Sequence, residues 1–157
     1  MGLFSRKGNT DKLYETTMKY NYLIRSLFPD PEISKDLTCM FLTFGWELYC
    51  LNHFLSVPNS DTQKLVQSLK NALFAADVSN DGVLTGLSLI HEAHTQCQAA
   101  IEKSASAPHG SAFSNPLYLL TKQLFSFCEV PFDITFSPVI TGGLSEYIEQ
   151  SAIAYKK

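Results

Sequence analysis

The sequence predicts an all-α fold, an irregular bundle of about six helices with one extended segment near residues 130–140. Three observations lead to this prediction. Apolar residues recur every three or four positions through most of the chain, which is the helical period. Typical start and stop residues separate these stretches. The composition, 45% hydrophobic and 17% charged over 157 residues, is that of a folded domain with a sizeable core.

The expected domain organisation is simple. We expect a flexible N-terminal tail over residues 1–9 and a single helical domain over residues 10–157. A stretch of small and polar residues at 104–116 contains two prolines and a glycine, so it predicts a mobile loop.

The first helix is expected over residues 11–28, because Asn9 or Thr10 can cap its start and Pro29 follows its end. Four residues mark the side that faces the core: Leu13, Tyr20, Ile24 and Leu27.

The second helix is expected from Asp30 and Pro31 to about Leu55, since Asp is a good N-cap and Pro suits the first helical position. Residues 37–57 are apolar nearly all round and are long enough to span a membrane. Glu47, within this run, would be costly in lipid. We therefore expect a central helix of a soluble core.

The third and fourth helices follow. Ser60 and Gln63 match a capping box that opens a helix over residues 60–76. The fourth helix is expected over residues 84–103. The apolar sides are marked by Leu65, Val66, Leu69 and Leu73 in the third helix and by Leu87, Ile90, His94, Cys97 and Ile101 in the fourth.

The C-terminal part contains the one change of period. Asn115 and Pro116 predict the start of a helix that ends near Cys128. Apolar and polar residues then alternate over residues 132–137, which favours an extended arm. The glycines at 142 and 143 predict a turn before a last helix over residues 144–155.

Residues 77–88, DVSNDGVLTGLS, resemble a calcium-binding loop up to their last position. Asp77, Ser79, Asp81 and Thr85 occupy ligand positions, and glycine stands sixth. Ser88 replaces the bidentate glutamate expected at the twelfth position, so any calcium site would be weak. An ordinary turn between two helices explains the same residues, because Asp, Asn and Gly also suit turns.

A second metal hypothesis concerns transition metals. His91, His94 and Cys97 share one side of the fourth helix, and Glu47, Cys50 and His53 repeat that spacing on the second. If the two helices face each other, imidazole and thiolate groups could meet around zinc. The alternative is a hydrogen-bonded histidine beside an inert thiol in an apolar core.

The clearest candidate for partner binding lies on the first helix. Tyr14, Met18, Tyr22 and Arg25 form a second side that faces away from the core residues. Tyr, Met and Arg are enriched at protein interfaces. The alternative is that another helix of the chain covers this side. The extended arm near residues 132–136 offers a second surface, for strand pairing or for a homo-oligomer.

The N-terminus suggests at most a weak contact with a membrane surface. Leu3 and Phe4 combine apolar insertion with the positive charges of Arg6 and Lys7. Arg6 stands where a myristoylation pattern has Ser or Thr.

The function that the sequence favours is non-enzymatic. No nucleophile motif or phosphate-binding loop is present, so an enzyme is the weaker hypothesis and no cofactor is expected. The net charge of -3 argues against nucleic-acid binding. The four cysteines follow no secretory signal, which predicts reduced thiols in the cytoplasm. We expect a regulator, adaptor or neutralising partner that binds another protein. A metal-binding sensor or enzyme and a peripheral membrane protein are the alternatives.

Overall fold

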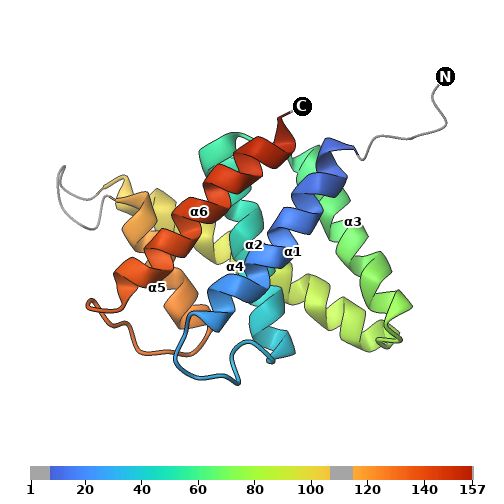
Figure 1. Ribbon diagram of the computed structural model, residues 1–157, viewed down its shortest axis with the longest axis horizontal. Coiled ribbons are helices and arrows are strands. Elements are labelled where there is room, and N and C mark those ends of the chain that lie inside the picture. Colours follow the sequence, from blue (N-terminus) through green and yellow to red (C-terminus); the bar gives the residue numbers. More distant parts are fainter. Residues whose placement is uncertain (1–7, 107–114, 157) are drawn as a thin grey trace.

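The computed structural model describes residues 8–106 and 115–156, and within these residues the chain forms six α-helices and no strand. The predicted all-α bundle is therefore confirmed. In chain order the helices are α1 (Asn9–Ser26), α2 (Leu37–Leu55), α3 (Asn59–Ala75), α4 (Asn80–Ser104), α5 (Pro116–Phe127) and α6 (Ser137–Tyr155). In Figure 1, α1 and α6 lie side by side across the front of the bundle.

Helix α2 is the centre of the bundle, as its apolar sequence predicts, and it contacts each of the other five helices. Three consecutive residues show why one helix can do this. Gly45 lies against α4, the Trp46 indole N–H donates to the carbonyl of Leu120 in α5 at 2.8 Å, and Glu47 accepts from Asn21 in α1. Because successive helical side chains point about 100° apart, these three residues reach three different neighbours.

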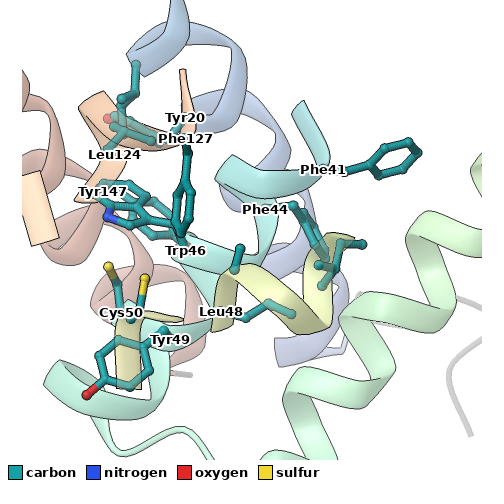
Figure 2. Packing of buried hydrophobic residues seen from close by; sticks show 14 of the residues in the cluster. Tyr20, Phe41, Phe44, Trp46, Leu48, Tyr49, Cys50, Leu124, Phe127 and Tyr147 are labelled. Atoms are coloured by element: carbon teal, nitrogen blue, oxygen red, sulfur yellow. The ribbon is translucent and has the colours of Figure 1, made fainter. Parts of the chain in front are cut away.

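The hydrophobic core collects around α2. Its largest fully buried side chains are Trp46, Tyr147, Phe44 and Phe125, drawn from α2, α5 and α6. Figure 2 shows part of this cluster, with Trp46 and Phe44 of α2 in its interior. Three of the four expected core residues of the first helix are buried, whereas Leu27 is 38% exposed.

Helices α2 and α4 approach closely because both carry glycine where they cross. A Cβ atom on Gly45 would meet the backbone of Ile90 and would lie 2.8 Å from the Cβ of Ala93. A Cβ atom on Gly86 would run into the ring of Phe41. Any larger residue at either position would push the two helices apart.

The start of the second helix was predicted too early. Residues 31–35 form turns, in which the Asp30 side chain accepts from the Glu32 N–H at 2.9 Å. The helix begins at Leu37, and Asp36 caps it by accepting from the Cys39 N–H. Two Asp residues could cap, and the second one does. The prediction of a helix start at Asp30 and Pro31 was therefore wrong.

The extended arm is shorter than predicted, and the last helix begins earlier. Only residues 130–133 are free of helix and turn before α6 starts at Ser137. The Asp133 side chain accepts from the N–H and hydroxyl of Thr135, which bends the chain into the helix. The glycines at 142 and 143 lie inside α6, so the predicted turn there was wrong.

Two smaller corrections concern helix ends. No side chain caps α3, which begins at Asn59, so the predicted capping box of Ser60 and Gln63 does not form. Asn9 belongs to α1 rather than to the predicted tail. Residues 107–114, most of the predicted mobile loop, lie outside the described residues.

Candidate functional site

The predicted partner-binding residues of α1 do not share one surface. Tyr14 and Met18 are partly buried against the core, and Tyr22 is 56% exposed. Arg25 is buried, with 6% of its surface exposed. Arg25 is therefore no surface residue, and Tyr22 alone among the four is open to a partner.

Arg25 has an internal role instead. Its Nη1 donates to the carbonyls of Ile33 and Ser34, at 3.1 and 2.7 Å, and holds the turn between α1 and α2 against α1. Its Nε donates to the side-chain oxygen of Asn21 at 2.8 Å. The guanidinium thus satisfies groups of its own chain, as a buried charge must.

Asn21 links this arginine to a buried acid. Its amide donates to Glu47 Oε1 at 2.9 Å and to the carbonyl of Met40 at 3.1 Å. Glu47 Oε2 has no hydrogen-bond partner within the described part of the chain. Burial raises the pKa of Glu47 well above its usual value, although the Asn21 hydrogen bond and the Arg25 charge oppose this shift.

A second pair of polar groups lies between α1 and α6. The hydroxyls of Thr17 and Tyr147 are hydrogen-bonded at 2.8 Å, and both residues are fully buried. Burial is the main cause that raises the pKa of Tyr147 well above its usual value. Together with Asn21, Arg25 and Glu47, these residues form a polar cluster that is sealed from solvent. We call it the internal polar cluster.

The outer side of α1 and α6 carries exposed apolar residues. Leu23 and Leu27 are 41% and 38% exposed, and Val139 at the start of α6 is 44% exposed. Leu27 packs on α6, because a Cβ atom on Gly143 would lie 3.0 Å from the end of the Leu27 side chain. We call Leu23, Leu27, Val139 and Gly142 the α1–α6 face. Tyr22, one residue before Leu23, points away from α6, because it lies opposite the α1 residues that contact that helix. Sequence reasoning assigned Leu27 to the core and did not consider Leu23 or Val139.

The histidines of α4 are partly brought to α2, as the transition-metal hypothesis required. His94 hydrogen-bonds with the side chain of Asn52 at 2.8 Å and packs edge-on against Tyr49. Burial and the nearby His91 lower the pKa of His94. Asn52 is the partner that sequence reasoning missed.

The thiols and acid of that hypothesis lie elsewhere. Cys97, Cys50 and Glu47 are fully buried, while His91 is exposed. Burial raises the pKa of both thiols. Residues 8–106 and 115–156 hold no group of three His, Cys, Asp or Glu side chains that could bind a metal ion.

His94 does line two neighbouring hollows between α2, α3 and α4, of about 520 and 320 Å³. The larger also contains His91, and the smaller contains Tyr49 and His53. His53 stacks on Tyr49 with ring centroids 5.6 Å apart. His53 and His94 thus both contact the Tyr49 ring, and His94 also contacts the Asn52 amide.

The calcium-like stretch folds mostly as helix. Asp77 has a left-handed φ of 61°, and the helix begins three residues later at Asn80. The Ser79 hydroxyl accepts from the Gly82 N–H at 3.1 Å and so acts as the N-cap. Asp81 and Thr85 are exposed in the first turns of α4. The open loop on which the calcium prediction relied is not formed, and weak cation binding there stays a prediction.

The membrane prediction concerns the first residues of the chain. Leu3, Phe4, Arg6 and Lys7 lie outside the described residues. Among the helices that are described, none combines the length and apolar character needed to cross a membrane.

Comparison with known proteins adds no relative to this picture. No family model matches the chain, and no curated protein or solved structure is significantly similar to it.

Proposed function

We propose that this protein acts without catalysis, by binding another protein through the α1–α6 face. The observation that supports this proposal most is the exposure of Leu23 and Leu27, at 41% and 38%, at the end of α1, where Leu27 packs on α6. Large apolar side chains gathered on one surface favour association, because contact removes them from water.

The shape of α6 favours a helix as the bound element. Nothing lies within 4 Å of a Cβ atom placed on Gly142, so a partner can approach the backbone of α6 at this point. Val139, Gly142, Glu146 and Ile153 recur at spacings of three, four and seven, which places them on one side of α6. This exposed side of α6 is open enough for an amphipathic partner helix to pack against it.

The negative charges on α6 indicate what kind of side chain the partner carries. Glu146 and Glu149 are exposed on α6, and Glu146 accepts from the Tyr20 hydroxyl at 2.9 Å. We therefore propose a partner helix whose apolar side is flanked by Lys or Arg. Such complementary charges orient the partner and speed its association.

Site-specific photo-crosslinking in the native cell tests this proposal. A photoreactive phenylalanine analogue replaces Leu23, which is 41% exposed, in one variant and, as the matched control, replaces Phe74 of α3, which is 42% exposed, in another. The expected result is a discrete protein adduct from position 23 that position 74 does not give.

A second pair of variants, at Gly142, tests whether the partner packs against the exposed side of α6. Gly142→Lys adds bulk and positive charge, so we expect the adduct to fall about tenfold, whereas Gly142→Ala should keep it. Identical adducts from positions 23 and 74, or an adduct that survives Gly142→Lys, would contradict the proposed face.

A further inference from the structure

Two of the four cysteines, 89 positions apart in the sequence, meet in the structure. Cys39 lies in the first turn of α2, and Cys128 is the C-cap of α5. Their Sγ atoms are 2.8 Å apart. Two thiols at this separation need only a small change in side-chain angle to bond to each other.

A hollow leads to this thiol pair from the surface. It has a volume of about 360 Å³ and is lined by both cysteines. Four acidic residues border it: Asp30, Glu32, Asp36 and Glu129. The hollow is therefore large enough for a small reagent, and its negative rim disfavours anions.

The two thiols differ in their readiness to react. The hydrogen bond from Cys128 is the main cause that lowers the pKa of Cys39, and the Arg25 charge adds to it. The same contact, with burial, raises the pKa of Cys128. Cys39 lies at the positive N-terminal end of α2 and Cys128 at the negative C-terminal end of α5, which also favours the thiolate at Cys39. Because the thiolate is the nucleophile, Cys39 is the thiol that attacks and Cys128 the one that resolves.

We infer that Cys39 and Cys128 form a redox-modification site, which small uncharged or cationic disulfides oxidise to an intramolecular disulfide. The pair lies at the end of an open, acid-rimmed hollow and joins the start of α2 to the end of α5.

The reaction is a two-step thiol–disulfide exchange. The Cys39 thiolate attacks one sulfur of the small disulfide, which forms a mixed disulfide and expels one small thiolate. The Cys128 thiol then loses its proton and attacks the Cys39 sulfur, which expels the second small thiolate. Two protein thiols are oxidised, one small disulfide is reduced to two thiols, and the protons pass to those thiols.

The chain supplies its own control for this reaction. Cys50 and Cys97, on α2 and α4, have no exposed surface at all. Burial raises the pKa of both, so neither is expected to react.

The test treats the reduced full-length chain with 2-hydroxyethyl disulfide, which is uncharged, and then alkylates the remaining thiols in denaturant. Peptide mapping should find Cys39 joined to Cys128, with Cys50 and Cys97 alkylated. Cystamine, which is cationic, should react at least as fast, and anionic glutathione disulfide about tenfold more slowly. The cross-link should raise the thermal midpoint by about 10 °C.

Two variants test the order of attack. Cys128→Ser should accumulate the mixed disulfide at Cys39, and Cys39→Ser should react slowly at Cys128; circular dichroism checks that each variant folds. Mapping of the unaltered chain decides the proposal even where a variant does not fold. A Cys50–Cys97 bond, or four thiols that all stay reduced in the native chain, would overturn it.

Discussion

Helix α2 packs against α4 and against α1 through different kinds of contact. Toward α4, Gly45 and the Gly86–Phe41 contact let the two helices touch closely where they cross. Toward α1, Glu47 and Asn21 are buried and hydrogen-bonded, and Arg25 completes the chain of contacts. The contact with α4 requires that the two glycines carry no side chain. The contact with α1 requires that each buried polar group keeps its hydrogen-bond partner.

This difference also bears on function. The carboxyl group of Glu47 and the guanidinium of Arg25 are the side chains best suited to catalysis. Both are buried, and they form hydrogen bonds with Asn21 and with backbone carbonyls of the chain. They stabilise the junction of α1 and α2. The surface that we propose for partner binding, the α1–α6 face, lies on the outside of the bundle.

The largest effect is expected from Arg25→Leu. It leaves Asn21 Oδ1 and the carbonyls of Ile33 and Ser34 without their donor, so the free energy of unfolding should fall by about 3–5 kcal/mol. Urea unfolding measures the change. Lys12→Leu, at an exposed position of the same helix, should alter it by less than about 0.5 kcal/mol. Equal effects of both variants would break the comparison.

On the opposite side of α2, Gly45→Ala should cost about 1–3 kcal/mol, because the added Cβ meets the backbone of Ile90. The matched control is Gly142→Ala, where a Cβ meets nothing within 4 Å. That control should stabilise the protein by about 0.5–1 kcal/mol, since alanine favours the helix. Thermal unfolding of both variants measures the two changes in stability. If Gly45→Ala did not lower the stability, the close approach of α2 and α4 would be contradicted.

The smallest effect is expected on the outside of α1. Tyr22→Ser should change the free energy of unfolding by less than about 0.5 kcal/mol, because this side chain is mostly exposed. Tyr20→Ser, buried two residues earlier, should cost about 3 kcal/mol. A large loss of stability for Tyr22→Ser would show that this residue supports the fold and is not free for a partner.

The sequence predicted the helices well because their apolar periods are long. It predicted their starts less well because several residues compete to cap each one. Asp36 rather than Asp30 caps α2, and Ser79 turns a calcium-like stretch into the start of α4. Such choices depend on which backbone N–H each side chain reaches, and composition does not reveal that.

The candidate surface was predicted only in part, for a related reason. Arg25 looked like an interface residue because arginine is enriched at protein interfaces, but it binds the carbonyls of residues 33 and 34 of its own chain. Phe132, Ile134 and Phe136 looked like a strand; in fact both phenylalanines pack on Phe125 while Ile134 is 72% exposed. Contacts between distant residues decided both cases. Similarly, no spacing in the sequence indicated that Cys39 and Cys128 meet.

The internal polar cluster makes a specific prediction about pH. Well below about pH 4.5, the usual pKa of a glutamate, Glu47 carries its proton in both the folded and the unfolded chain. Above that pH the unfolded carboxyl ionises, but the folded one keeps its proton up to its raised pKa. The folded state therefore loses stability as pH rises, by at most about 1.4 kcal/mol per pH unit.

The most direct test of this account is the free energy of unfolding of the unaltered protein and of Glu47→Gln, measured from pH 4 to pH 8. All other titrating groups are common to both, so their difference reports Glu47. We expect the glutamine variant to gain stability relative to the unaltered protein as pH rises above about 4.5. A difference that stays constant, or that moves in favour of the unaltered protein, would contradict a carboxyl group held neutral inside the bundle.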